Sequence, residues 1–224
     1  MKLFVDSANL GEIEEALARG FVAGITTNPS ILAREERVDF TEHVHRILGM
    51  IRRSGRDSPL SVEVSVEDPD EMLDQALKFV AAFRYPQLSV KVPIGWDELR
   101  VIAELRRRDI RVNCTCCMSF NQAYMAALAG ANYVSLFYNR IRDTGYDARL
   151  VVAETVRAFR EGGVDAEVIV GSIRHPYDVN EAFSAGAHIV TVPSKLLPPL
   201  TRHPKTTEAV DQFLSDFRRW SDPA

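Results

Sequence analysis

The sequence predicts an α/β fold in which eight parallel strands, each followed by a helix, close into a (β/α)8 barrel. Short apolar runs alternate with longer amphipathic segments of helical period, the pattern of repeated strand-helix units. Eight such units in 224 residues leave little room for a second domain, so we expect one domain over residues 1–224. No glycine-rich phosphate loop follows the first strand, where Asp6-Ser-Ala-Asn9 stands, and an open doubly wound sheet therefore fits less well.

The units follow one another in a regular order. The apolar runs predict strands at residues 2–6, 22–26, 60–65, 87–92, 111–117, 132–138, 166–172 and 188–193. The segments between them predict helices over Leu10 to Ala18, Val38 to Arg53, Pro69 to Phe83, Asp97 to Arg107, Phe120 to Ala129, Leu150 to Glu161 and Pro176 to Ala185. Asn9 is a candidate cap of the first helix, and Pro69 and Pro176 stand where helices begin. Three glycines follow helices as C-terminal caps would: Gly20, Gly130 and Gly186.

A further helix, at about residues 206–220, is predicted beyond the last barrel unit. Thr206 to Trp220 carries apolar residues at helical spacing: Val210, Phe213, Leu214 and Phe217. An apolar stripe of this kind needs a partner surface. We expect it either to seal the barrel or to pack on another subunit.

Composition and charge exclude several classes of partner. The net charge of -4 and the pI near 5.8 give no electrostatic case for binding nucleic acid or an anionic membrane. No apolar run approaches the roughly 20 residues that span a bilayer. The chain opens with the strand-like Lys2-Leu-Phe-Val5 and without a signal-peptide pattern. We therefore expect a cytoplasmic protein with neither nucleic acid nor membrane as partner.

The cysteines and histidines indicate no metal site. Cys114, Cys116 and Cys117 are too close together for structural disulfides among themselves, and no neighbouring histidine supplies a second pair of ligands. His43 and His45 stand two residues apart in a predicted helix, so their rings point to different faces. We expect the cysteines to act as small buried apolar residues in a reducing compartment.

Lys91 places an ammonium group near the end of a buried apolar strand, Leu88-Ser-Val-Lys-Val-Pro93. A buried lysine without a fixed counter-charge loses proton affinity, and a neutral amine can attack a carbonyl to form a Schiff base. The alternative is an edge-strand lysine whose ammonium reaches water. The other predicted strands favour the catalytic interpretation.

Polar side chains occupy inward-facing positions near the C-terminal ends of most predicted strands, where such barrels carry their active sites. The set is Asp6, Thr26 with Asn28, Glu63, Lys91, Asn113 with Thr115, Ser135 and Ser172. A single Ser or Thr in such a place more often bonds to nearby backbone. Three charged side chains facing one interior indicate function, because buried charges are unfavourable.

These residues suit the cleavage of a carbon–carbon bond in a ketose. A Schiff-base lysine needs a carboxylate to move the proton of the hydroxyl at the bond that breaks, a role that fits Asp6. It also needs a group that handles water, and Glu63 and Thr115 can hold one water between them. Arg140 and Arg174 follow strands six and seven, where a terminal phosphate or sulfonate would lie. Surface ion pairs are the alternative for both arginines.

Seven short motifs extend over nearly the whole chain. They are Phe4-Val-Asp-Ser-Ala-Asn9, Gly24-Ile-Thr-Thr-Asn-Pro-Ser30, Val62-Glu-Val64, Val90-Lys-Val-Pro93, Asn113-Cys-Thr115, Tyr133-Val-Ser135 with Phe137 and Arg140, and Ser172-Ile-Arg-His-Pro176. In these motifs and their order, the chain resembles the short-chain transaldolases, a subfamily that also includes fructose-6-phosphate aldolases. The Thr-Thr-Asn-Pro-Ser segment together with the lysine of strand four is highly specific.

The resemblance implies a reaction and a role for each residue. Lys91 would form the Schiff base, Asp6 would be the acid/base for cleavage, and Glu63 with Thr115 would position the catalytic water. The substrate would be bound by Thr26, Asn28, Asn113, Ser135, Phe137, Arg140, Ser172 and Arg174, with the two arginines on the phosphate. The enzyme would move a dihydroxyacetone unit from a ketose phosphate, such as sedoheptulose 7-phosphate or fructose 6-phosphate, to an aldose phosphate, as in the pentose phosphate pathway. The resemblance implies no metal or organic cofactor and a homo-oligomer, a pentamer or decamer.

Three alternatives stay open at this point. The first is an aldolase that releases free dihydroxyacetone, although Phe137 and Glu63 stand where the aldolase branch tends to carry tyrosine and glutamine. The second is a transaldolase for a modified, for example sulfonated, ketose, because Tyr138 and Arg142 depart from the family pattern beside the anion site. The third is a non-catalytic barrel that binds sugar phosphates.

Overall fold

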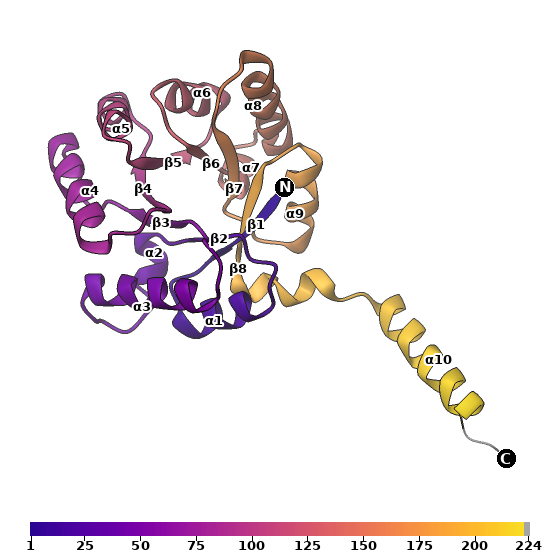
Figure 1. Cartoon of the computed structure of the whole chain (residues 1–224). Coiled ribbons are helices and arrows are strands. Elements are labelled where there is room, and N and C mark those ends of the chain that lie inside the picture. Colours follow the sequence, from indigo (N-terminus) through magenta and orange to yellow (C-terminus); the bar gives the residue numbers. More distant parts are fainter. Residues whose placement is uncertain (222–224) are drawn as a thin grey trace.

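The computed structural model, which describes residues 1–221, is a closed barrel of eight parallel strands in chain order (Figure 1). The strands are β1 (Lys2–Asp6), β2 (Gly24–Thr26), β3 (Leu60–Glu63), β4 (Leu88–Pro93), β5 (Arg111–Cys117), β6 (Tyr133–Phe137), β7 (Glu167–Gly171) and β8 (Ile189–Pro193). Strand β8 pairs with both β7 and β1, so the ring closes. The predicted (β/α)8 barrel is confirmed, and the alternative of an open sheet is wrong.

An outer ring of helices covers the barrel (Figure 1). The predicted helices are all present, as α1 (Leu10–Ala18), α3 (Phe40–Arg53), α4 (Pro69–Phe83), α5 (Glu98–Arg107), α6 (Phe120–Leu128), α8 (Ala148–Gly162), α9 (Pro176–Ser184) and α10 (Pro204–Ser221). Two short helices were not predicted, α2 (Pro29–Leu32) and α7 (Tyr138–Asp143), nor were the 3-10 turns η1 (Ser194–Leu196) and η2 (Pro198–Thr201). They are too short to show a helical period in the sequence. Within residues 1–221, no helix has the length and apolar character needed to cross a membrane.

Local sequence signals set the ends of these helices. The Asn9 side chain accepts a hydrogen bond from the Glu12 amide at 3.1 Å and so caps α1, as predicted. Pro69 and Pro176 are the first residues of α4 and α9. The three predicted capping glycines, Gly20, Gly130 and Gly186, have φ values of +78°, +106° and +92° just beyond helix ends.

An apolar plug fills the N-terminal half of the barrel interior. It consists of Phe4, Tyr133, Ile169 and Ile189, all buried. The Phe4 ring needs a glycine opposite it, because a β-carbon on Gly24 would lie 2.5 Å from Phe4 Cζ. Polar side chains replace this packing toward the carboxyl ends of the strands, and that end is therefore the entrance to the interior.

Strand β5 contains a bulge that brings one extra residue to the barrel mouth. Its register with β6 shifts between Cys114 and Cys117, and Cys116 has a φ of +62°. Cys114 and Cys117 are fully buried, as predicted for small apolar residues, and their Sγ atoms are 3.9 Å apart. Cys116 differs from the prediction in being only partly buried, because the bulge turns it away from the packed face.

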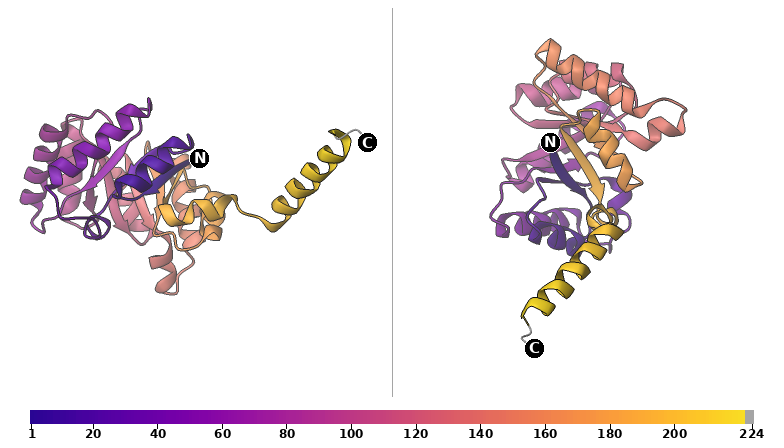
Figure 2. Two further views of the ribbon diagram at one scale, coloured as in Figure 1. Left: turned by 90° about the horizontal axis from the view of Figure 1, so that it is seen from below. Right: turned by 90° about the vertical axis from the view of Figure 1, so that its right-hand side faces the viewer.

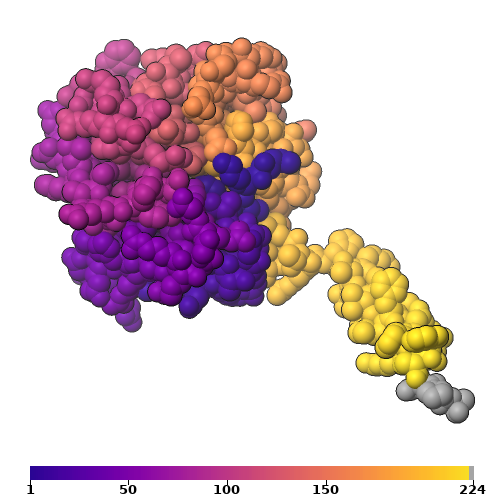
Figure 3. Space-filling view, viewed as in Figure 1, coloured from indigo at the N-terminus to yellow at the C-terminus, as the bar shows by residue number. Residues whose placement is uncertain are grey.

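The C-terminal helix α10 is present as predicted but does not seal the barrel. It projects away from the barrel in every overall view (Figures 1, 2 and 3). Its apolar stripe is open to solvent, with Phe213 70%, Phe217 61% and Trp220 82% exposed. Within residues 1–221 this stripe of large apolar side chains covers no other part of the protein, and an exposed stripe of this kind is typical of an interaction surface.

Candidate active site

Lys91 lies inside the barrel and forms an ion pair with Glu63. Its Nζ atom is 2.7 Å from Glu63 Oε2, and the two side chains are only 6% and 14% exposed. The ammonium also donates a hydrogen bond to the Thr27 carbonyl oxygen at 3.0 Å. The two residues meet because Glu63 and Lys91 are register partners on β3 and β4. The structure thus supplies a counter-charge to Lys91, a feature that the sequence alone did not reveal.

Asp6 stands at the end of β1, held by Thr26, which in turn contacts Thr191. Thr26 Oγ1 donates to Asp6 Oδ1 at 2.7 Å and lies 2.6 Å from the Thr191 hydroxyl. Burial raises the pKa of the Asp6 carboxyl above its usual value, and the charge of Lys91 and the Thr26 hydrogen bond offset this only in part. Asp6 is therefore a carboxyl group whose proton exchanges closer to neutral pH than that of an exposed aspartate.

A buried chain of neutral polar groups crosses the interior beside Lys91. Asn113 Nδ2 donates to Ser61 Oγ at 3.1 Å, and Ser135 Oγ donates to Asn113 Oδ1 at 2.7 Å. Asn113 and Lys91 are register partners on β5 and β4. The Thr115 hydroxyl, two residues along β5, is buried and has no hydrogen-bond partner among residues 1–221. It is thus available to a water molecule or a substrate.

Asn28 and Phe137 occupy the ends of their strands. Asn28 caps the short helix α2, since its side chain accepts from the Ile31 amide at 3.0 Å. Phe137 is partly buried at the end of β6, and the exposed Arg140 on α7 lies over its ring at 5.6 Å. Arg140 forms no ion pair within residues 1–221, so its charge is available to an anion at the mouth.

Arg174 is already paired in this structure. Its guanidinium binds the Asp143 carboxylate through two nitrogens, at 2.7 and 2.5 Å, and both side chains are about half exposed. This hydrogen bond to Arg174 is the main reason why the pKa of Asp143 lies below its usual value. A substrate anion that binds Arg174 must therefore compete with Asp143, as the surface-ion-pair alternative anticipated.

The turn after β7 holds Ser172 in a left-handed conformation, with a φ of +58°. The Asn139 side chain donates to the Ser172 carbonyl oxygen at 2.9 Å and to Asp178 at 2.6 Å. Arg142 and Tyr138, whose identities depart from the family pattern, are engaged with the carboxylates of α9: Arg142 Nη1 is 3.2 Å from Asp178 Oδ1, and the Tyr138 hydroxyl donates to Glu181 at 3.1 Å.

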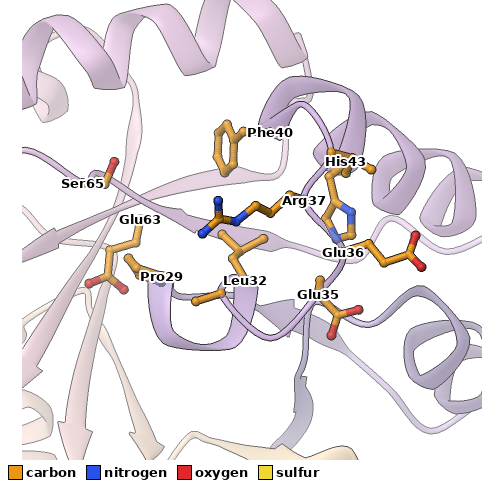
Figure 4. Close-up of a pocket in the computed structure, with 11 residues that line it drawn as sticks. Pro29, Leu32, Glu35, Glu36, Arg37, Phe40, His43, Glu63 and Ser65 are labelled. Carbon is orange, nitrogen blue, oxygen red and sulfur yellow. The ribbon is translucent and has the colours of Figure 1, made fainter.

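A cavity of about 540 Å³ opens beside Glu63 (Figure 4). Its walls come from α2, from the segment before α3, from the first turn of α3 and from the end of β3, and they include Leu32, Arg37 and Phe40. In Figure 4, Arg37 extends between Phe40 and Leu32. Its size is that of a small-molecule site. Glu63 thus contacts Lys91 inside the barrel and also borders a cavity at the mouth.

The structure brings some of the predicted site residues into contact and adds polar partners that the sequence did not indicate. Direct contacts join Lys91 to Glu63, Asp6 to Thr26, and Asn113 to Ser135, whereas no side-chain bond joins Asn28, Thr115, Ser172 or Arg140 to them. The residues missed are Ser61, Thr191, Asn139 and Asp178, together with the Thr27 carbonyl. Ser61 and Thr191 carry a detectable signal, because each lies on the inward-facing positions of its strand.

Comparison with known proteins identifies the family of the chain. The family described as transaldolase/fructose-6-phosphate aldolase matches residues 3–222. A probable transaldolase of Desulforudis audaxviator is 42% identical over 219 residues, 98% of each chain. Probable transaldolases of Moorella thermoacetica, at 40% over 98% of each chain, and Dehalococcoides mccartyi, at 38% over 97% of this chain and 98% of its own, are similarly related. The chain therefore belongs to the transaldolase/fructose-6-phosphate aldolase family.

Proposed function

We propose that the protein is a transaldolase that carries a dihydroxyacetone unit on Lys91, from a ketose phosphate of the sedoheptulose 7-phosphate or fructose 6-phosphate type to an aldose phosphate. The single observation that carries this proposal is the buried Lys91–Glu63 pair, 2.7 Å apart, at the carboxyl end of the barrel. A barrel that only bound sugar phosphates would gain nothing from two desolvated charges at this place. Membership of the family supports the same reaction.

The first half of the reaction joins the donor to Lys91. Glu63 accepts a proton from the ammonium, and the neutral amine attacks the C2 carbonyl of the ketose. The resulting carbinolamine loses its oxygen as water, with the proton returned from Glu63, and becomes the iminium. The buried Thr115 hydroxyl, which has no hydrogen-bond partner among residues 1–221, would hold that water together with Glu63.

The second half breaks and remakes a carbon–carbon bond. Asp6 takes the proton from the C4 hydroxyl, the C3–C4 bond breaks, and its electron pair moves into the iminium to give an enamine. The released fragment is an aldose phosphate. The enamine then attacks the aldehyde carbon of the acceptor, Asp6 returns the proton to the new alkoxide, and water regenerates the Lys91 amine. A carboxyl group with a raised pKa suits a proton that is both taken and returned.

The polar chain and the arginines would orient the sugar. Asn113 and Ser135 offer neutral hydrogen-bonding groups beside Lys91, and Asn28 lies at the end of β2. Arg140 and Arg174 would bind the phosphate at the mouth, the latter by exchanging its Asp143 partner for the substrate.

Phe137 favours transfer over release of free dihydroxyacetone. Its ring offers no hydrogen bond that could hold a proton-donating water near the enamine. The enamine therefore persists until an aldehyde arrives. The measurement is turnover of fructose 6-phosphate with and without an added aldose phosphate, and rapid release of dihydroxyacetone without an acceptor would favour the aldolase alternative.

Borohydride trapping tests the proposal as a whole. Reduction in the presence of fructose 6-phosphate is expected to add the mass of a sugar-derived fragment to the peptide that contains Lys91. The Lys91→Met variant, with no amine at this place, should gain none. Absence of an adduct in the native protein, or an equal adduct in the variant, would defeat the Schiff-base reaction.

We further propose that α10 joins copies of this chain into a homo-oligomer, a pentamer or decamer. The exposed stripe of Phe213, Phe217 and Trp220 supports this arrangement, because large apolar side chains repeated along one face are unfavourable in water. A second copy of the chain presents a surface of the same kind at the same concentration.

A substitution on this stripe should change the assembly. We expect Phe217→Glu to reduce the oligomer to smaller species, because a charge would be buried in the contact between subunits. Gln212→Glu introduces the same charge on the polar face of α10 and should leave the assembly intact. Light scattering coupled to size exclusion gives the mass of each species, and an unchanged mass for Phe217→Glu would rule out this role of the helix.

A further inference from the structure

Asp178 is an almost fully buried carboxylate outside the reacting centre, with more hydrogen bonds than its helix requires. Its side chain, 2% exposed, lies in the first turn of α9. The Oδ2 atom accepts from the Arg174 amide at 2.9 Å, from the His175 amide at 2.9 Å and from Asn139 Nδ2 at 2.6 Å. The Oδ1 atom accepts from Arg142 Nη1 at 3.2 Å.

These bonds connect two different loops of the barrel mouth. The Arg174 and His175 amides belong to the turn between β7 and α9, where a carboxylate in the first helical turn commonly bonds backbone N–H groups. Asn139 and Arg142 belong to α7, the helix that carries Arg140. Helix capping explains the first two bonds but gives no reason for the other two.

Asn139 extends the connection to Ser172. Its amide nitrogen, already bonded to Asp178, also donates to the Ser172 carbonyl oxygen at 2.9 Å. Ser172 has a φ of +58°, a conformation that a residue other than glycine keeps only when its surroundings hold it there. Asp178 and Asn139 together therefore fix the path of the backbone between β7 and Arg174.

We propose that Asp178 is a positioning residue that sets the spacing of Arg140 and Arg174 for the anionic tail of the substrate. This inference rests on the proposed function, in which those two arginines bind the phosphate. One carboxylate bonds the backbone of the turn that carries Arg174 and two side chains of the helix that carries Arg140, so it couples the backbone positions from which the two cations extend. An anion that bridges two arginines on different loops is sensitive to their separation.

The Asp178→Asn variant tests this role with two donors. The amide replaces one acceptor oxygen by a donor, so it cannot accept from the turn and from both α7 side chains at once. We expect the KM for fructose 6-phosphate to rise about tenfold or more, with kcat within about threefold of the native value. With fructose as donor, which undergoes the same cleavage but lacks the phosphate, KM should change by less than about twofold. Inorganic phosphate should also inhibit the variant about tenfold more weakly.

A matched control lies one turn further along the same helix. Glu181 accepts from the Tyr138 hydroxyl and lies 3.6 Å from Arg142, but it bonds nothing in the turn that carries Arg174. Glu181→Gln should leave the KM for both donors unchanged. Should Asp178→Asn fail to fold, Asn139→Ala removes the bond to Ser172 and should show the same dependence on phosphate.

The outcomes separate this inference from the proposed function. An equal loss with both donors, or no change with either, would overturn the positioning role while the native enzyme remained active. Loss of phosphate preference in Arg174→Ala but not in Asp178→Asn would overturn it as well. A native protein without turnover or borohydride adduct would instead overturn the proposed function and this inference with it.

Discussion

Replacement of Lys91 by methionine is expected to lower kcat by about four orders of magnitude or more. Methionine has nearly the length of lysine and no nucleophile, so the covalent intermediate cannot form. The residual contacts to the sugar remain, and its binding should therefore change much less than its turnover. Lys78→Met, on the exposed face of α4, is the control and should leave kcat unchanged.

The same substitution should also destabilise the fold, by about 3 kcal/mol, because it leaves the Glu63 carboxylate buried without its partner. The double variant Lys91→Met/Glu63→Gln removes both charges. We expect it to recover most of the lost stability and none of the activity. This pair of results would separate the chemical role of Lys91 from its role in the core.

Denaturant unfolding and steady-state kinetics of the native protein, Lys91→Met, Glu63→Gln and the double variant complete this cycle. If Lys91→Met is inactive but as stable as the native protein, Glu63 must find another partner or take up a proton in that variant. Activity within tenfold of the native value in Lys91→Met would refute the Schiff-base proposal outright.

The second large effect is expected for Asp6→Asn. We expect kcat to fall about 10²- to 10⁴-fold, because an amide cannot take the proton of the C4 hydroxyl. The Thr26 hydroxyl can still donate to the oxygen of the amide, so the geometry of the site should be kept. Borohydride trapping should still label Lys91 in this variant, since Asp6 acts after the Schiff base has formed.

The stability of Asp6→Asn should depend on pH in a predictable direction. Burial raises the pKa of Asp6 in the folded protein, so its protonated form favours folding. That contribution is fully present below the pKa in the unfolded chain, about 3.9, and is lost as the pH rises through the higher folded pKa. The variant never ionises and should therefore gain stability relative to the native protein as the pH is raised from about 4 to 8.

Thermal unfolding of both proteins across this pH range measures the difference. Asp109→Asn, at a fully exposed aspartate, is the control and should show no such trend. If the native protein were the more stable of the two at neutral pH, the Asp6 carboxylate would be stabilised by its neighbours rather than destabilised by burial. The proton transfer proposed for Asp6 would then not depend on a raised pKa.

The barrel and its polar mouth were predictable because they follow from local patterns. Each strand carries three to seven residues with an inward alternation, and caps such as Asn9, Pro69 and Pro176 mark where helices begin. Closure of eight such units then brings Asp6 and Lys91 into one interior, although they lie far apart in the sequence. Position along a strand was sufficient to predict that these two side chains face the same interior.

The remaining features depend on contacts that no local pattern encodes. The pairing of Lys91 with Glu63 depends on the register of β3 and β4, and the Arg174–Asp143 pair depends on where the short helix α7 ends. Asp178 looks in the sequence like an ordinary first-turn acidic residue of a surface helix. Only the tertiary fold places α7 against it and turns it into a buried bridge between loops.

The apolar plug that contains Phe4, packed against Gly24, closes the barrel interior at its N-terminal end. A sugar that enters over the carboxyl ends of the strands must therefore leave through the same opening. Under the proposed function, the aldose fragment of the donor would occupy the space that the acceptor needs, and it would have to leave before the acceptor binds. Under the proposed chemistry, the covalent tether on Lys91 keeps the remaining three carbons in place during the exchange.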